Sequence, residues 1–125
     1  MGNPVVHFEV TGKDGNALQT FYQQLFAWEI DSSNTNGYGL VNTGGGISGG
    51  IGGGDGSDES SWVTFYVEVE DPQATLNQVE KLGGETRMPV TDIPGGPTMA
   101  LFRDPEGHMI GLLKAEDHTH PHEPS

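Results

Sequence analysis

An internal repeat restricts the fold of this chain more than any other feature of its sequence. The segment HFEV at residues 7–10 is similar to the segment YVEV at residues 66–69, and Tyr66 lies 59 positions after His7. In each half of the chain a strand pattern is followed by a helical pattern and then by three more strand patterns. Because a repeated sequence has repeated local preferences, we expect two similar βαβββ modules.

A strand pattern and a helical pattern open the first copy. Apolar and polar residues alternate over residues 5–10, which predicts a strand with His7 and Glu9 on the face opposite its apolar side chains. Over residues 15–26 apolar residues recur every three and four positions, so we expect an amphipathic helix packed on the apolar face of that strand. The apolar stripe of this helix consists of Leu18, Phe21, Tyr22, Leu25 and Phe26.

The second copy repeats this order. Residues 63–69 alternate as a strand, and a helix opened by Asp71-Pro72 carries Leu76, Val79 and Leu82. The sequence DPEG at residues 104–107 has Pro second and Gly fourth, which is typical of a type I turn. The remaining expected strands cover residues 28–30, 38–41 and 47–51 in the first copy and residues 87–90, 98–102 and 108–113 in the second.

Two segments lack apolar periodicity and set the expected domain boundaries. The Gly, Ser and Asp-rich segment at residues 55–61 is expected to be a linker between a first module at residues 1–54 and a second at residues 62–114. Residues 115–125 combine histidines, acidic residues and prolines, so we expect a disordered His-rich acidic tail. Metal binding by the tail is expected to be incidental, although three of the five residues from 118 to 122 are His.

The charge and the cysteine content limit the functional classes. The chain has 5 basic and 18 acidic residues, a formal net charge of −13. Nucleic acids and anionic membranes would repel such a surface, so neither is expected as a partner. There is no cysteine, and we found neither a signal-peptide pattern nor an apolar run near the ~20 residues that span a bilayer. A soluble cytoplasmic protein is the expectation.

Three segments resemble the glyoxalase/bleomycin-resistance/dioxygenase (vicinal oxygen chelate) superfamily. They are the His-bearing first strand, the helix end FYQQLFAW at residues 21–28, and the turn and final strand DPEGHMIGL at residues 104–112. The resemblance covers roughly residues 4–114. It implies an α+β fold in which two tandem βαβββ modules form a curved mixed sheet, a cup with the helices on its outside.

The resemblance also implies a divalent metal held by the first and last strands of each module. Glycine has no side-chain donor and neutral tyrosine is a weak one, so we expect the cup to lack this metal unless Glu9, Glu68 or His108 is recruited. The matching positions in this sequence are His7, approximately Gly50, Tyr66 and Gly111.

The expected ligand site is the cup, and three functions remain open. His7 is the candidate general base or ligand contact, because the ordinary pKa of histidine is about 6.5. One possibility is a metal-independent small-molecule-binding protein or enzyme. The second is a metal-dependent lyase, isomerase or dioxygenase that uses His7, and the third is a non-catalytic, ligand-sequestering homodimer of the resistance type. The residues expected to line the cup are His7, Glu9, Tyr66 and Glu68.

The polar faces of the first strands also have a simpler explanation, since an antiparallel sheet can present polar residues to water without binding a ligand. The family resemblance is what favours a binding role. We also expect a homodimer, because the family commonly completes its cups across two chains.

Overall fold

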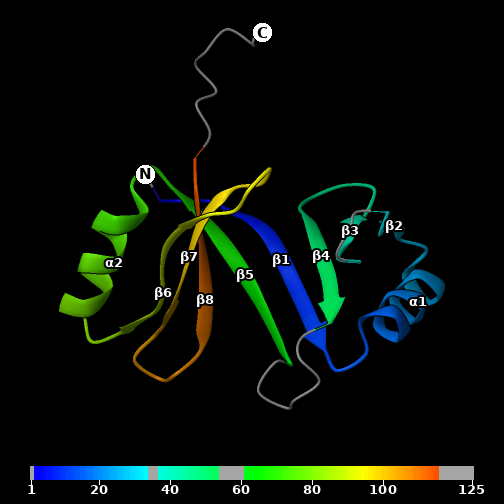
Figure 1. Ribbon diagram of the computed structural model, residues 1–125, viewed down its shortest axis with the longest axis horizontal. Helices are drawn as coiled ribbons and strands as arrows, with labels where there is room; N and C mark the ends of the chain where they lie inside the picture. Colours follow the sequence, from blue (N-terminus) through cyan, green and yellow to red (C-terminus); the bar gives the residue numbers. More distant parts are fainter. Residues whose placement is uncertain (1, 34–36, 54–60, 116–125) are drawn as a thin grey trace, which may run out of the picture. The chain divides into compact units, whose positions relative to one another are not determined.

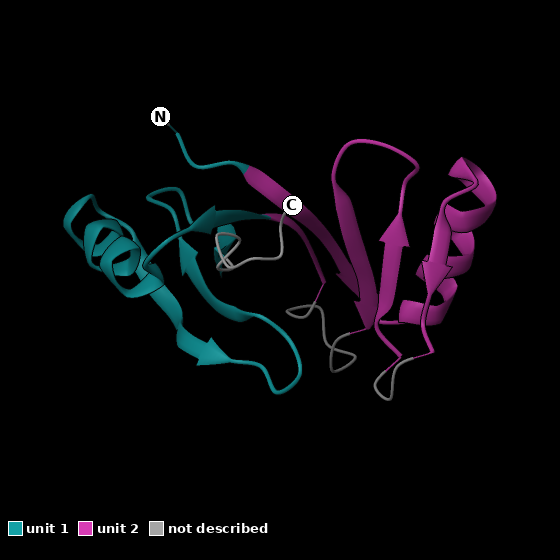
Figure 2. Cartoon of the chain, turned by 90° about the horizontal axis from the view of Figure 1, so that it is seen from above, with its two compact units in different colours: residues 1–4, 66–125 teal, residues 5–65 magenta. Residues whose placement is uncertain are grey.

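The computed structural model describes residues 2–33, 37–53 and 61–115. The chain forms two compact units, coloured separately in Figure 2. Unit 2 comprises Val5–Phe65, and unit 1 comprises Met1–Pro4 with Tyr66–Ser125. Residues 55–60 of the expected linker and residues 116–125 of the expected tail lie outside the described residues, so those domain boundaries stay a prediction.

The elements follow the order that the repeat predicts, strand, helix and three strands, twice (Figure 1). In the first half they are β1 (Val5–Gly12), α1 (Gly15–Phe26), β2 (Glu29–Asp31), β3 (Gly39–Asn42) and β4 (Ser48–Gly53). In the second half they are β5 (Trp62–Val69), α2 (Pro72–Lys81), β6 (Glu85–Asp92), β7 (Thr98–Arg103) and β8 (Met109–Lys114). No helix within the described ranges is long and apolar enough to cross a membrane.

In unit 2 the strand order is β2-β3-β4-β1. Strands β1 and β4 are parallel, whereas β3 pairs with β2 and β4 in antiparallel fashion. The Asp14 carboxylate caps α1 by accepting a hydrogen bond from the Ala17 N–H at 3.0 Å. The buried Gln19 amide of α1 donates to the Ile51 carbonyl of β4 at 2.8 Å. Helix α1 therefore packs on β4 through a polar contact as well as apolar ones.

Part of the stripe predicted for α1 is exposed rather than buried. Phe21, Leu25 and Phe26 each keep more than half of their surface accessible. The aromatic rings instead pack on one another, since the Tyr22 and Phe26 rings both contact the Trp28 ring, at centroid distances of 5.8 and 5.0 Å. The periodicity identified the apolar face of the helix, but only part of that face reaches the sheet.

Unit 1 has the strand order β5-β8-β7-β6, with β5 parallel to β8. Asp71 caps α2, and its carboxylate accepts from the Ala74 N–H at 3.1 Å. Leu82, predicted to belong to the apolar stripe, lies at the helix end and is 74% exposed. The core of unit 1 consists of Val69, Leu76, Ala100 and Leu112, with Val67, Val90 and Phe102 packed against it.

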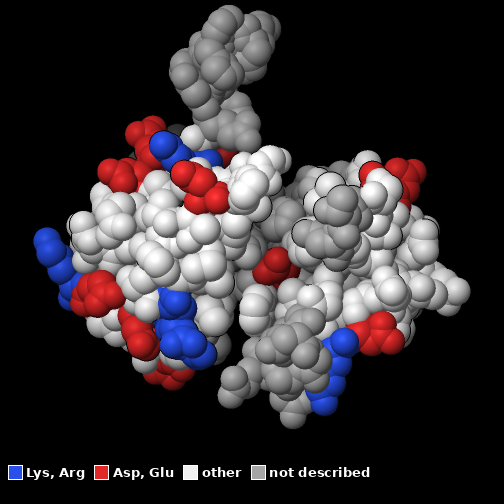
Figure 3. Space-filling model, in the orientation of Figure 1, with Lys and Arg blue, Asp and Glu red and all other residues white. Residues whose placement is uncertain are grey.

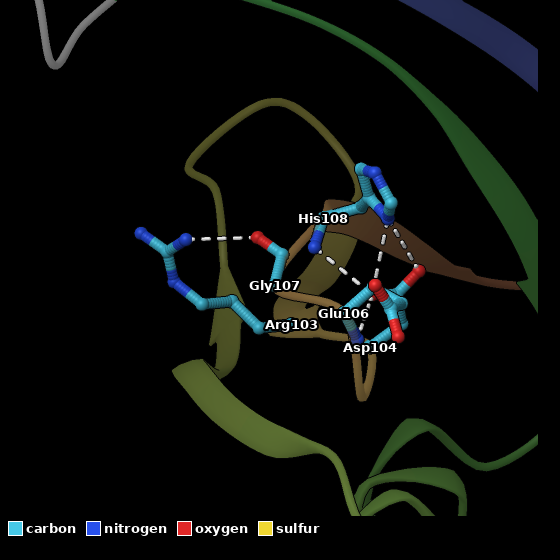
Figure 4. A network of polar contacts seen from close by, with 5 residues as sticks. All are labelled: Arg103, Asp104, Glu106, Gly107 and His108. Atoms are coloured by element: carbon cyan, nitrogen blue, oxygen red, sulfur yellow. Dashed lines mark hydrogen bonds and ion pairs between the residues drawn. The ribbon is translucent and has the colours of Figure 1, made fainter.

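The predicted turn between β7 and β8 forms around Asp104, as Figure 4 shows. The Asp104 carboxylate accepts hydrogen bonds from the backbone N–H groups of Glu106 and His108, both at 2.9 Å. Its carbonyl accepts from the Gly107 N–H at 2.8 Å, which closes the turn. The His108 N–H is the main cause that lowers the pKa of Asp104. These contacts indicate that the Asp-Pro-x-Gly sequence builds the turn.

Candidate functional site

Four side chains in unit 2 form a hydrogen-bonded network, which we call the His7 network (His7, Glu9, Tyr38 and Trp62). His7 Nε2 lies 3.3 Å from the Tyr38 hydroxyl. The same hydroxyl donates to Glu9 Oε2 at 3.0 Å, and the Trp62 indole N–H donates to Glu9 Oε1 at 3.1 Å. All four side chains are half-buried. The Tyr38 hydroxyl therefore links the imidazole of His7 to the carboxylate of Glu9.

The glycines of β4 make room for Tyr38. Glu9 of β1 is the register partner of Gly50 in β4. A Cβ atom at residue 50 would overlap the Tyr38 hydroxyl, and a Cβ at residue 52 would lie 2.8 Å from the Tyr38 ring. The tyrosine thus occupies the space that a side chain at residue 50 would need, which is why this position requires glycine.

A second tyrosine occupies the corresponding place in unit 1. Tyr66 of β5 pairs with Gly111 of β8, and a Cβ at Gly111 would overlap the Tyr66 ring. Tyr66 is buried, with 4% of its surface accessible. Glu68 lies two residues further along β5 and is half-buried. The predicted ligand residues thus fall into two pairs, His7 and Glu9 in unit 2 and Tyr66 and Glu68 in unit 1.

The structure corrects the register of the internal repeat. The two N-cap residues, Asp14 and Asp71, are 57 positions apart, and β1 and β5 begin and end with the same spacing. By this alignment Glu9, rather than His7, corresponds to Tyr66, and each has a glycine of the module's last strand as its register partner. The alignment at 59 positions was two residues out of register. A shift of two leaves each side chain on the same face of its strand.

His7 also lines a groove of about 530 Å³ in unit 2. Ser48, the register partner of His7 in β4, lies beside it. The carboxylates of Glu29 and Asp31 contribute negative charge to this lining. The other lining residues are Ile30, Leu40, Val41, Asn42 and Gly49. The imidazole is thus shared between an open groove and the His7 network.

Burial lowers the pKa of His7 below its ordinary value of 6.5, and the nearby Glu9 carboxylate opposes this shift without cancelling it. The ring is therefore neutral at neutral pH. A neutral imidazole has one nitrogen that donates a hydrogen bond and one that accepts, so it can take a proton from a ligand.

This shift predicts how His7 affects stability. The unfolded chain binds a proton at His7 near pH 6.5, whereas the folded chain binds it only at lower pH. Between these values the unfolded state holds more protons, so the His7 contribution to the free energy of unfolding should fall as the pH drops from about 7.5 towards 5. Urea unfolding of the wild type and of His7→Gln across this range measures it. Relative to His7→Gln, the wild type should lose stability at acid pH; a relative gain would contradict the expectation.

The donor set does not fit the metal that the resemblance implies. In the described part of the chain, no three or more His, Cys, Asp or Glu side chains cluster closely enough to hold a metal ion. Tyrosines fill the space over Gly50 and Gly111. His108, considered as a substitute ligand, lies 72% exposed in the turn and pairs with Asp104 at 3.1 Å. Whether the purified protein holds a metal stays a prediction.

Charge is distributed unevenly between the units. Four of the five Lys and Arg residues belong to unit 1, whereas Lys13 belongs to unit 2. On the face of unit 1 that Figure 3 shows, basic and acidic side chains lie next to one another. The groove in unit 2, by contrast, includes Glu29 and Asp31 but no Lys or Arg among its lining residues. Its local charge disfavours an anionic ligand.

Comparison with known sequences identifies a family. Residues 5–112 match the family model described as Glyoxalase/Bleomycin resistance protein/Dioxygenase superfamily. The mycobacterial protein named Putative glyoxylase CFP32, from Mycobacterium tuberculosis and from Mycobacterium bovis, is 31% identical over 113 residues. The match covers 84% of this chain and 43% of that protein, so the chain spans less than half the length of these relatives.

Solved structures share the fold. A hypothetical protein from Bacillus halodurans has a TM-score of 0.67 at 11% identity, covering 94% of this chain and 97% of its own. A superfamily member from Vibrio splendidus has a TM-score of 0.63 at 15% identity, with 91% and 100% covered. Methylmalonyl-CoA epimerase from M. tuberculosis has a TM-score of 0.64 at 11% identity, with 90% and 87% covered. The predicted α+β class with two tandem βαβββ modules is confirmed.

Proposed function

We propose that this chain, which belongs to the Glyoxalase/Bleomycin resistance protein/Dioxygenase superfamily, binds a small polar molecule in the unit 2 groove through His7, without a metal ion. One observation carries the proposal: His7 lines the groove while the Tyr38 hydroxyl joins it to Glu9. A side chain held by such a network is preorganised for contact with a ligand. Gly50 and Gly111, in turn, offer no donor for a coordination sphere.

The groove favours a neutral or cationic ligand over an anionic one. Glu29 and Asp31 contribute two carboxylates to its lining. Leu40 and Ile30 supply apolar surface for the carbon skeleton of the ligand, and His7 supplies a hydrogen bond. Methylmalonyl-CoA carries a carboxylate and phosphates, so these acidic residues argue against it as the ligand of this chain.

The neutral imidazole gives the site a possible chemistry. His7 can accept the proton of an acidic O–H or C–H group of a bound carbonyl compound, which is general-base catalysis. Ligand sequestration is the second candidate function, because the same two carboxylates would hold a cationic compound such as bleomycin without reaction.

Binding measurements with three probes test the proposal. Dihydroxyacetone is neutral, bleomycin is cationic and methylmalonyl-CoA is anionic. Calorimetric titration and amide NMR shifts should show binding of the neutral or the cationic probe at residues of the groove, and exclusion of methylmalonyl-CoA. Consumption of the neutral probe would indicate an enzyme, and binding of bleomycin without turnover would indicate sequestration.

Substitution of His7 should weaken this binding. Loss of one hydrogen bond in a partly buried site costs about 1–3 kcal/mol, so His7→Ala should raise the Kd by about 5-fold to 150-fold. His108→Ala is the matched control, because His108 is exposed in the unit 1 turn. Equal Kd values for wild type and His7→Ala would remove His7 from the site. Stoichiometric metal in untagged protein that His7→Ala abolishes would replace the proposal with the metal-dependent function.

A further inference from the structure

We propose that Tyr38 is a positioning residue that holds His7 as the Nε2–H tautomer, so that Nδ1 is the basic nitrogen of the neutral ring. The link to a bound ligand rests on the function proposed above. The tautomer itself does not, because it follows from hydrogen bonds within the chain. Tyr38 was absent from the residues that the sequence analysis selected.

The direction of the hydrogen bonds follows from counting protons. An indole N–H can only donate, so the bond from Trp62 requires an acceptor at Glu9 Oε1. The other carboxylate oxygen, Oε2, accepts the single proton of the Tyr38 hydroxyl at 3.0 Å. That hydroxyl has no second proton to offer to His7.

The contact with His7 must therefore run from the ring to the hydroxyl. His7 Nε2 lies 3.3 Å from the Tyr38 oxygen. With the hydroxyl proton directed to Glu9, an unprotonated Nε2 would place one lone pair against another. A proton on Nε2 turns this repulsion into a hydrogen bond. In the neutral ring Nδ1 then carries the lone pair.

This arrangement defines the movement of a proton during general-base chemistry. A proton leaves an acidic O–H or C–H bond of the ligand and binds Nδ1, and the bonding electrons stay on the ligand. Nε2–H remains bonded to Tyr38, and Tyr38 keeps its own proton directed to Glu9. The Glu9 carboxylate then stabilises the imidazolium across the hydroxyl. Tyr38 acts only through His7 and does not exchange a proton.

Replacement of Glu9 by glutamine gives the sharpest test, because it reverses the hydrogen bonds without changing the size of the side chain. The Trp62 N–H would still require an oxygen acceptor, which turns the amide oxygen of the introduced glutamine towards Trp62 and its NH₂ group towards Tyr38. The Tyr38 oxygen would then accept from this NH₂ group and donate its proton to His7 Nε2. We therefore expect Glu9→Gln to convert His7 to the Nδ1–H tautomer.

Long-range ¹H–¹⁵N NMR of the imidazole, above pH 7.5 and without ligand, measures the tautomer. The wild type should show Nε2–H, Glu9→Gln should show Nδ1–H, and Tyr38→Phe should lose the preference. The expected change in the tautomer ratio is on the order of tenfold, the effect of one hydrogen bond. His108 in the same spectra is the internal control, since its partner Asp104 is unchanged.

Two results would overturn the proposal: Nδ1–H in the wild type, or the same tautomer in the wild type and Glu9→Gln. If Glu9→Gln does not fold, Tyr38→Phe, which keeps the ring, decides alone: an unchanged ratio contradicts the proposal and a lost preference supports it. Failure of the three probes to bind would contradict the proposed function and would leave the tautomer result standing. Where a probe binds, Tyr38→Phe should raise its Kd only when His7 is present.

Discussion

Leu76→Ala is expected to lower the free energy of unfolding by about 2–5 kcal/mol, the usual cost of emptying a leucine site in a packed core. Leu76 is 2% exposed, and α2 brings it against Val69, Ala100 and Leu112. Unit 1 has few other fully buried side chains among the described residues, so neighbours are poorly placed to fill the resulting cavity. Urea unfolding followed by circular dichroism measures the loss.

Leu82→Ala is the matched control for this substitution. It removes the same atoms from the end of the same helix, but Leu82 is 74% exposed. We expect a change within about 0.5 kcal/mol, as for surface substitutions in general. Similar losses from the two leucines would contradict the position of the unit 1 core.

The order of the elements could be predicted from the sequence because each one depends on local periodicity. Alternation over residues 5–10 and the three- and four-residue spacing over residues 15–26 placed β1 and α1 within two residues of their observed ends. The helix caps and the Asp104 turn are equally local. Burial of the α1 stripe was predicted incorrectly at Phe21, Leu25 and Phe26, because periodicity defines an apolar face without showing how much of it another element covers.

The site was harder to predict because its contacts join distant segments. Tyr38 and Trp62 lie 29 and 53 positions from Glu9, and no motif relates them. The glycines of β4 were a usable signal: a strand rich in glycine indicates close approach of another group. The repeat register failed by two residues because alternating strands match equally well at any even shift. The homodimer, the cytoplasmic location and the absence of metal stay predictions.

Gly50→Ala tests whether the space above β4 is needed for Tyr38. In a strand, alanine is normally favoured over glycine by about 0.5–1 kcal/mol. Here the added Cβ would overlap the Tyr38 hydroxyl, so we expect instead a loss of about 1–3 kcal/mol in the free energy of unfolding. Displacement of the ring should also separate Tyr38 from His7 and change the imidazole NMR signals.

Two comparisons separate this overlap from a general effect of alanine. Gly45→Ala should be nearly neutral, because a Cβ at residue 45 meets nothing within 4 Å and the backbone there is not left-handed. In the Tyr38→Ala background the overlapping ring is absent, so Gly50→Ala should lose its cost or become stabilising. Since the two residues are in contact, the double-mutant cycle should give a coupling energy of about 1–3 kcal/mol. Additive effects would mean that Tyr38 does not occupy the space over Gly50, and the link between His7 and Glu9 through its hydroxyl would fail with it.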